Sequence, residues 1–188
     1  KAFGVLLDTR YVFDGYSIYL EDEGAAPGDD YSGDVPPYSV GMGAASCAIP
    51  IGSSFVIQPT IYAGWATESL GHMNFIHALA VGGIRAGRYV DNQLPFFGFS
   101  SGFHTCGRYA ATTRLDLRYQ INHKNFVTLR GGSFHDEHSM NHLWTRKPTA
   151  YAFGAEIGQR SAVGPMLLGV QWCDLTGVSV SLSLGFDF

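Results

Sequence analysis

The clearest pattern in the chain is a strict alternation of apolar and small polar residues over positions 178–188. One set of alternate positions is apolar throughout, and the other holds only serine, glycine and aspartate. Successive side chains of a β-strand point to opposite faces, so this segment is predicted to be a strand with one apolar face. The apolar positions are Val178, Val180, Leu182, Leu184, Phe186 and Phe188.

Similar alternation recurs along the rest of the chain and predicts an all-β fold. The predicted strands, beside 178–188, are 2–13, 38–48, 53–67, 75–84, 107–121, 125–135, 149–160 and 165–173. They give about eight or nine strands of roughly ten residues, the length with which a tilted strand crosses a bilayer. Short turns such as 122–124 and 161–165 contrast with long polar connections at 14–37, 86–106 and 136–148. This contrast is typical of an antiparallel barrel with short turns at one end and long loops at the other.

The apolar faces are predicted to point outward, toward lipid. A soluble barrel would instead turn them inward and would carry more Lys and Glu on its exposed face. The polar faces hold mainly Gly, Ser, Ala and Thr with a few charges, aromatic residues recur near the segment ends, and the last strand finishes on Phe188. We therefore favour an antiparallel transmembrane β-barrel of about 8–9 strands. The water-soluble alternative is a lipocalin-like barrel or a sandwich.

Composition agrees with a barrel and excludes several other classes. The 188 residues are 46% hydrophobic, 14% aromatic and 15% charged, with 24 Gly. About 25% charged residues are usual in soluble domains, and disordered chains or helical repeats need still more. The net charge of −4 and the absence of a basic run argue against nucleic acid as a partner.

Other compositional signals are weak. The three cysteines, Cys47, Cys106 and Cys173, lack metal-ligand spacing, and we predict neither a metal nor a cofactor. The chain lacks a run of 18 apolar residues, and its first residues lack the apolar core of a signal peptide. We treat residues 1–188 as one domain and expect that a leader or an upstream domain has been omitted.

Motifs in the second half carry a resemblance to a family. A strand ending in Gly82-Gly83 precedes the loop Asn92-Gln93-Leu94-Pro95-Phe96-Phe97-Gly98-Phe99. After the loop come the strands 113–119 and 125–129, the run Val163-Gly164-Pro165, a tryptophan strand and the C-terminal strand. Over residues 75–188, the order and spacing resemble the C-terminal outer-membrane barrel of Bacteroidetes-type patatin-like phospholipases.

The resemblance implies a patatin hydrolase, a small periplasmic domain and a barrel similar to the BamA-type surface-antigen superfamily, in which sixteen strands are usual. The present chain would then be part of a sixteen-stranded barrel. The resemblance also implies that the loop motif folds toward the lumen and that the chain end is a signal for the barrel-assembly machinery. The loop residues are Gln93, Pro95, Phe96, Phe97, Gly98 and Phe99, and the C-terminal assembly signal is Phe186 and Phe188.

Two departures from these families limit what the chain itself could do. The BamA-type loop carries an Arg-Gly-aromatic motif, and the matching place in 96–99 lacks the Arg. The chain also lacks the Gly-x-Ser-x-Gly elbow that presents the nucleophile of a patatin, and Asp14-Gly15 continues as Tyr16. We predict no catalytic residue here, so lipid acyl hydrolysis would belong to a missing upstream domain.

Charged residues on the polar faces are predicted to face the lumen. Charges in a narrow lumen need partners, so we favour a plugging salt-bridge network over a selectivity lining in an 8–9-stranded barrel. In a sixteen-stranded barrel the two readings are equally good. The residues are Arg114, Asp116, Arg118, Arg130 and Glu156.

Two polar loops contain side chains that could bind a metal ion or act in catalysis. The cluster near 136–148 could form a metal site or a His–Ser–acid hydrolase at the barrel rim, and the acidic run 21–34 could bind calcium. Neither has the spacing of a known site, so we favour solvated loops in both cases, and loop packing for Gly102, His104, Cys106 and Tyr109. The first cluster is His135, Asp136, Glu137, His138, Ser139 and His142, and the second is Glu21, Asp22, Glu23, Asp29, Asp30 and Asp34.

The sequence thus predicts a bacterial outer-membrane barrel that anchors or delivers an upstream hydrolase. Its partners would be outer-membrane lipids, the assembly machinery during insertion and a second copy in a homodimer. One alternative is a BamA-type assembly or translocation barrel. Another is a small barrel enzyme that acts on lipid A with His138 or His142.

Overall fold

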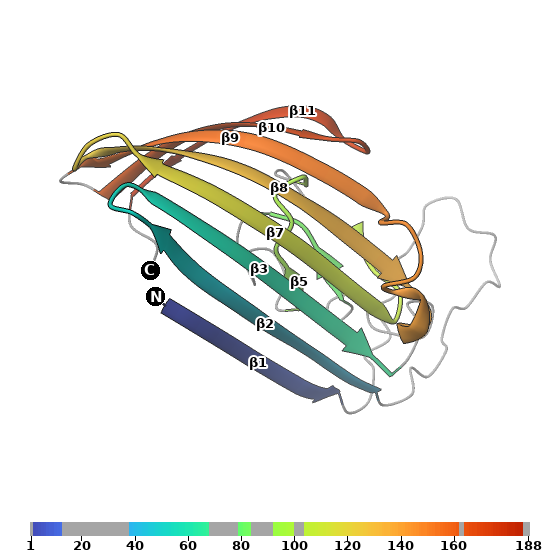
Figure 1. Cartoon of the computed structure of the whole chain (residues 1–188). Coiled ribbons are helices and arrows are strands. Elements are labelled where there is room, and N and C mark those ends of the chain that lie inside the picture. Colours follow the sequence, from blue (N-terminus) through green and yellow to red (C-terminus); the bar gives the residue numbers. More distant parts are fainter. Residues whose placement is uncertain are drawn as a thin grey trace.

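A computed structural model of the chain describes residues 2–12, 38–67, 79–83, 92–99, 104–161 and 164–185. Its main element is one antiparallel sheet of eight strands, in which every strand pairs with its neighbours in chain order (Figure 1). The all-β, antiparallel prediction is confirmed. In sheet order the strands are β1 (Ala2–Val12), β2 (Tyr38–Ile51), β3 (Phe55–Ala66), β7 (Tyr109–Gln120), β8 (Asn125–Glu137), β9 (Ala150–Ser161), β10 (Gly164–Cys173) and β11 (Gly177–Leu184).

The predicted strand 75–84 is wrong as a strand of the main sheet. Of its described part, only β4 (Ala80–Val81) forms a strand, in a separate three-stranded sheet with β5 (Gln93–Leu94) and β6 (His104–Thr105), and Gly83 adds an isolated bridge to Phe96. The extended run stops at Gly82 and Gly83, whose φ angles are 155° and 70°. Such positive φ values suit glycine and turn the chain out of the strand. The main sheet therefore has eight described strands, at the lower end of the predicted number.

Local turn chemistry sets the register of the hairpins. Between β7 and β8, the Asn122 side-chain oxygen accepts the backbone N–H groups of Lys124 (2.9 Å) and Asn125 (2.8 Å). This is the self-capping by which asparagine favours tight turns. The β10–β11 turn uses Gly177 at a φ of 76°, a conformation that costs glycine little. Pairing then runs unbroken along both hairpins.

The two ends of the sheet differ. The β2–β3, β7–β8 and β9–β10 turns lie at one end, where the N- and C-terminal ends of the described strands also lie (Figure 1). We name this the turn end. The β1–β2, β3–β7 and β8–β9 connections leave from the other, the loop end. The short 3₁₀ turn η2 (Met140–His142) lies in the last of these. Long and short connections therefore alternate largely as predicted.

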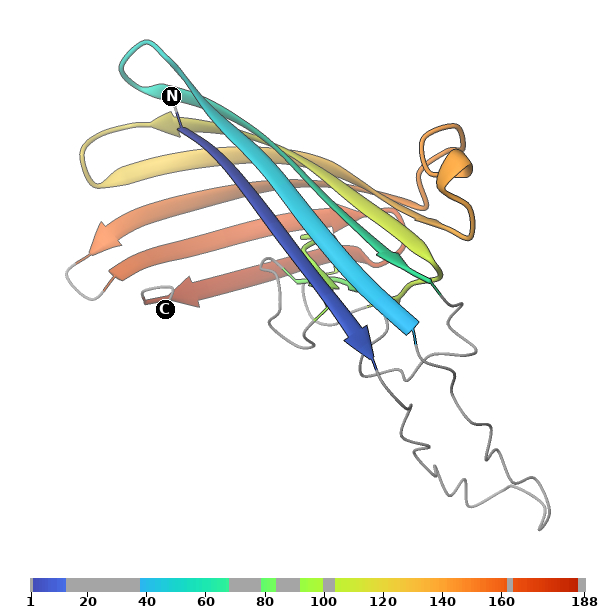
Figure 2. The same cartoon turned by 90° about the horizontal axis from the view of Figure 1, so that it is seen from below.

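The sheet is strongly curved, and the small sheet β5–β4–β6 lies against its concave side (Figures 1 and 2). A cluster of buried apolar side chains joins this small sheet to the concave face of the large one, toward the loop end. The two edges of the large sheet are β1 and β11, which do not pair with each other among the described residues. The cluster comprises Val40, Met42, Ala66, Leu79, Val81, Leu94, Phe96, Phe97, Cys106, Ala110, Phe134, Ala150, Ala152 and Cys173.

The outer, convex face carries large apolar side chains that are open to the surroundings. On β11 the alternating positions Val178, Val180, Leu182 and Leu184 are 62–70% exposed. Side chains of the same face continue across the other strands in register. They include Ile61, Trp65, Leu115, Tyr119, Leu129, Tyr151, Phe153, Ile157, Met166, Leu168, Val170 and Trp172.

Candidate functional site

Four charged side chains form a connected network on the concave face of β7, β8 and β9. The Asp116 carboxylate lies 3.2 Å from Nε of Arg114 and 3.3 Å from Nε of Arg130. Nη2 of Arg130 lies 3.5 Å from the Glu156 carboxylate on the next strand. Asp116 and Arg130 are direct cross-strand partners, and Arg114 is two residues from Asp116 and so shares its face. Buried charges require partners, and here each largely buried carboxylate lies beside at least one guanidinium group.

Arg118, the fifth of the predicted lumen charges, stands apart near the turn end. Its Nε donates to the Thr128 hydroxyl at 3.4 Å, and its guanidinium carbon lies 4.9 Å from the centroid of the Phe126 ring. That ring lies over Gly158, where a Cβ atom would be only 2.1 Å away. Arg118 is therefore held by a hydroxyl and an aromatic face, with much of its side chain exposed. All five predicted charges share the concave face of the sheet.

The loop motif 92–99 is folded against this same concave face. Residues 92–98 are buried, in contrast to an ordinary surface loop. Two threonines of the main sheet and its hairpin hold the backbone of the motif. The Thr112 hydroxyl donates to the Pro95 carbonyl at 2.8 Å, and the Thr176 hydroxyl donates to the Gly98 carbonyl at 2.9 Å. Bonds from both β7 and the β10–β11 turn fix the motif across the width of the concave face.

Aromatic rings of the motif pack on the sheet and reach the charge network. The Phe96 ring centroid lies 5.8 Å from that of Phe134 on β8 and 5.1 Å from that of Phe99. The Phe97 ring centroid lies 5.7 Å from the guanidinium carbon of Arg130. Arg130 therefore contacts both the ion-pair network and the folded-in motif, and links the two structurally.

Two glycines allow the close approach of motif and sheet. A Cβ atom on Gly132 of β8 would lie 2.4 Å from the Thr113 carbonyl oxygen and 3.0 Å from the Phe97 ring. A Cβ atom on Gly98 would lie 2.9 Å from the Ala152 Cβ atom on β9. The distances of 2.4 and 2.9 Å are too short for a side chain, and at 3.0 Å the Phe97 ring would have to move aside. Glycine at these positions therefore sets how closely the motif packs on the concave face.

A second attachment follows the motif, after β6. The Asp136 carboxylate accepts the Gly107 N–H at 2.9 Å and lies 3.6 Å from Nε2 of His104. Cys106, between these two residues, is fully buried. Burial, reinforced by the negative charge of Asp136, raises the pKa of the Cys106 thiol well above its ordinary value. This cysteine is therefore a packing residue and a poor nucleophile.

The polar cluster near 136–148 is not brought together as one site. Asp136 points to the concave face, whereas His135 points outward and lies under Trp144, with ring centroids 5.8 Å apart. His142 and His138 are exposed. In the described parts of the chain, no group of three or more His, Cys, Asp or Glu side chains is placed to hold a metal ion.

Sequence reasoning missed a polar contact on the outer face. The hydroxyls of Thr113 and Ser133 lie 2.8 Å apart, and the Ser133 hydroxyl lies 3.5 Å from Nε2 of His135. Thr113 and Ser133 are cross-strand partners of β7 and β8. The length of the turn at 121–124 could have predicted this contact, because it fixes the register of β7 against β8 and so places Thr113 opposite Ser133.

Several predicted residues lie outside the described parts of the chain. These are the C-terminal residues Phe186 and Phe188, the acidic run 21–34, and Gly102. Among the described residues, the structure has no helix long and apolar enough to span a membrane. Comparison of the chain with protein-family profiles, with curated proteins and with solved structures gives no match.

Proposed function

We propose that this chain is an outer-membrane β-barrel domain, in which the outer face of the eight-stranded sheet contacts lipid. The observation that carries the proposal is the inverted polarity of the sheet. Large apolar side chains are exposed on the convex face, whereas ionic and hydroxyl groups are buried on the concave face. In water this arrangement would expose an apolar surface far larger than soluble proteins tolerate. In a bilayer it is the expected arrangement.

The contents of the concave face support a barrel with more than eight strands. The interior of a closed eight-stranded barrel is only just wide enough for its own side chains. Here the concave face also holds the small sheet and the motif 92–99. We propose that β1 and β11 pair with further strands, as in the sixteen-stranded barrels that the sequence resembles. The extra strands would come from elsewhere in a longer chain or from a second copy.

The proposed role is to anchor, or to deliver, an upstream hydrolase at the bacterial outer membrane. The fixed position of the motif supports an anchor over a translocation channel, because it covers part of the concave face near the loop end. It is held there by the bonds from Thr112 and Thr176. In this role the partners are outer-membrane lipids and the assembly machinery. Acyl hydrolysis remains with the upstream domain.

Membrane insertion is tested by flotation of the full-length protein with vesicles of phosphatidylethanolamine and phosphatidylglycerol. We expect the folded protein to float with the vesicles in alkaline carbonate and to run faster on a gel before heating than after. A folded protein that stays in solution as a monomer without detergent would overturn the proposal.

The anchoring role is tested separately by the intact mass and the N-terminal sequence of the protein made by its source. We expect a mass far above 20.4 kDa, the mass of residues 1–188, with a Gly-x-Ser-x-Gly hydrolase upstream. A mass near 20.4 kDa would overturn the anchoring role but not the membrane location.

A further inference from the structure

The outer face contains a groove between β2 and β9. Two neighbouring rows of side chains line it, one row nearer the loop end and one nearer the turn end. The first row is Ala45, Ile61, Thr113, Ser133 and Tyr151, and the second is Cys47, Pro59, Leu115, Gly131 and Phe153.

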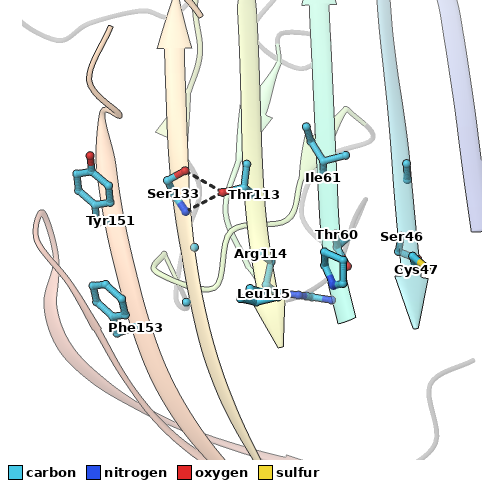
Figure 3. Close-up of a pocket in the computed structure, with 14 residues that line it drawn as sticks. Ser46, Cys47, Thr60, Ile61, Thr113, Arg114, Leu115, Ser133, Tyr151 and Phe153 are labelled. Carbon is cyan, nitrogen blue, oxygen red and sulfur yellow. Dashed lines mark hydrogen bonds between the residues drawn. The ribbon is translucent and has the colours of Figure 1, made fainter. Parts of the chain in front are cut away.

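The shape of the groove follows from side-chain size. Small residues at the centre, such as Gly131 and Ser133, leave the backbone of β8 almost uncovered, while Leu115, Tyr151 and Phe153 rise around them (Figure 3). The groove is open, has a volume of about 680 Å³ and is lined mainly by apolar groups. Ligand clefts typically occupy about 300–1,000 Å³ and have mostly apolar walls.

The loop-end side of the groove is polar. The backbone N–H of Ser133 donates to the Thr113 hydroxyl oxygen at 3.3 Å, and the two hydroxyls lie 2.8 Å apart (Figure 3). Beyond them lies the His135 ring, which is covered by Trp144. The groove is thus apolar along its length and has hydroxyl groups at one margin.

We propose that this groove is a binding site for one acyl chain of a bilayer lipid, with the ester group of that lipid near Thr113 and Ser133. This inference rests on the proposed membrane location. In a bilayer an empty groove would forfeit dispersion contacts, and a flexible chain fills a narrow concavity without strain. One of the two hydroxyls donates to the other, so one O–H remains to donate to an ester carbonyl, which would otherwise lack donors at that depth.

A second copy of the chain fits the groove less well. The outer face is convex (Figures 1 and 2), so two such faces would meet along a line and leave a concavity between them unfilled. Stable protein interfaces bury about 800 Å² on each partner, which a line contact does not provide. The geometry therefore points to lipid as the occupant.

The test blocks the groove with Gly131→Leu. A Cβ atom at Gly131 has only ordinary contacts of 3.5 Å with Phe153, so the backbone tolerates a side chain there. The control is Val180→Phe, which enlarges a side chain that is 67% exposed on the same face of β11, outside the groove. The probe is phosphatidylethanolamine with a photoactivatable diazirine on one acyl chain, in vesicles that hold the full-length protein. Crosslinked peptides are quantified by mass spectrometry.

We expect crosslinks to concentrate on peptides that contain Leu115 and Phe153. Gly131→Leu should reduce them about tenfold, the loss expected when two or more methylene groups no longer fit, while Val180→Phe leaves them unchanged. Even labelling of the outer face, unaffected by Gly131→Leu, would overturn the groove as a site but leave the membrane location intact. Absence of labelling on every outer-face peptide would instead overturn the membrane location, and the groove proposal with it.

Discussion

The two faces of the sheet obey opposite rules of burial, as two consecutive residues of β8 illustrate. Leu129 is 53% exposed on the outer face, whereas the Arg130 side chain is 10% exposed on the concave face and contacts two carboxylates. In a soluble protein the leucine would be buried and the arginine exposed. The sheet therefore achieves stability on one face by ion pairing and packing of a folded-in segment. The other face presents large apolar side chains to the surroundings, as the proposed contact with lipid would require.

The largest expected effect comes from breaking the polar face. Arg130→Ala removes the shared partner of Asp116 and Glu156, and leaves the largely buried Glu156 carboxylate without its arginine while Asp116 keeps only Arg114. We expect a loss of about 3–5 kcal/mol in the free energy of unfolding, measured by urea titration in vesicles. The control Arg146→Ala removes an ion pair whose arginine is 61% exposed, and should cost less than about 1 kcal/mol. Equal losses in the two variants would contradict the network.

A charge on the outer face should have the next largest effect. Leu168→Arg places a guanidinium where the leucine is 51% exposed on β10, and in lipid this should destabilise the fold by about 2–4 kcal/mol. In water the same change at an exposed site would be within about 0.5 kcal/mol of neutral. Ser183→Arg, on the concave face of β11, is the matched control. Urea titration in vesicles measures the free energy of unfolding of both variants. An unchanged value for Leu168→Arg would argue against lipid contact.

Two adjacent glycines of β8 point to opposite faces of the sheet. Gly132→Ala directs a methyl group at the Thr113 carbonyl and the Phe97 ring, and should cost about 1–3 kcal/mol through overpacking. Gly131→Ala directs the same group to the outer face, 3.5 Å from Phe153, and should be close to neutral. The free energies of unfolding of the two variants are measured by urea titration and compared. Equal values would mean that neither the Thr113 carbonyl nor the Phe97 ring crowds the concave side of β8.

The smallest effect concerns the attachment of the motif. Thr176→Val removes the hydrogen bond to the Gly98 carbonyl and should cost about 0.5–1.5 kcal/mol. Amide exchange of residues 92–99 should accelerate, while exchange in β11 stays unchanged. Thr145→Val, which removes a hydroxyl bond to Asn141 in the exposed β8–β9 connection, should not alter exchange in the motif.

Much of the fold could be predicted from period-two patterning, because one apolar face repeats on nearly every strand. All eight strands of the main sheet correspond to segments predicted from that alternation. The pattern failed at 75–84, where apolar residues pack into the cluster beneath the sheet and two glycines end the extended run. Alternation shows on which face of a strand each side chain lies. It does not show which sheet the strand joins.

The site was only partly accessible to sequence reasoning. The five concave-face charges could be assigned to one face from alternation within each strand. Their pairing, such as Asp116 with Arg130, depends on cross-strand register, which follows from turn geometry. The groove depends on how small and large side chains from five strands, β2, β3, β7, β8 and β9, lie next to one another, and it cannot be recognised from any one strand. The polar residues near 136–148 were predicted to form a solvated loop, whereas β8 extends to Glu137, so strand alternation sends His135 and Asp136 to opposite faces.

Spin labels along β11 test the proposed contact between the outer face and lipid. Cysteine-linked labels are placed one at a time at positions 178–183 of the full-length protein in vesicles. Their collisions with oxygen, which concentrates in lipid, and with a water-soluble nickel complex are then measured. We predict a period of two, with oxygen favoured at Val178, Val180 and Leu182 and suppressed at the intervening serines. Nickel access to the outer-face positions equal to that of a soluble protein surface would contradict the account.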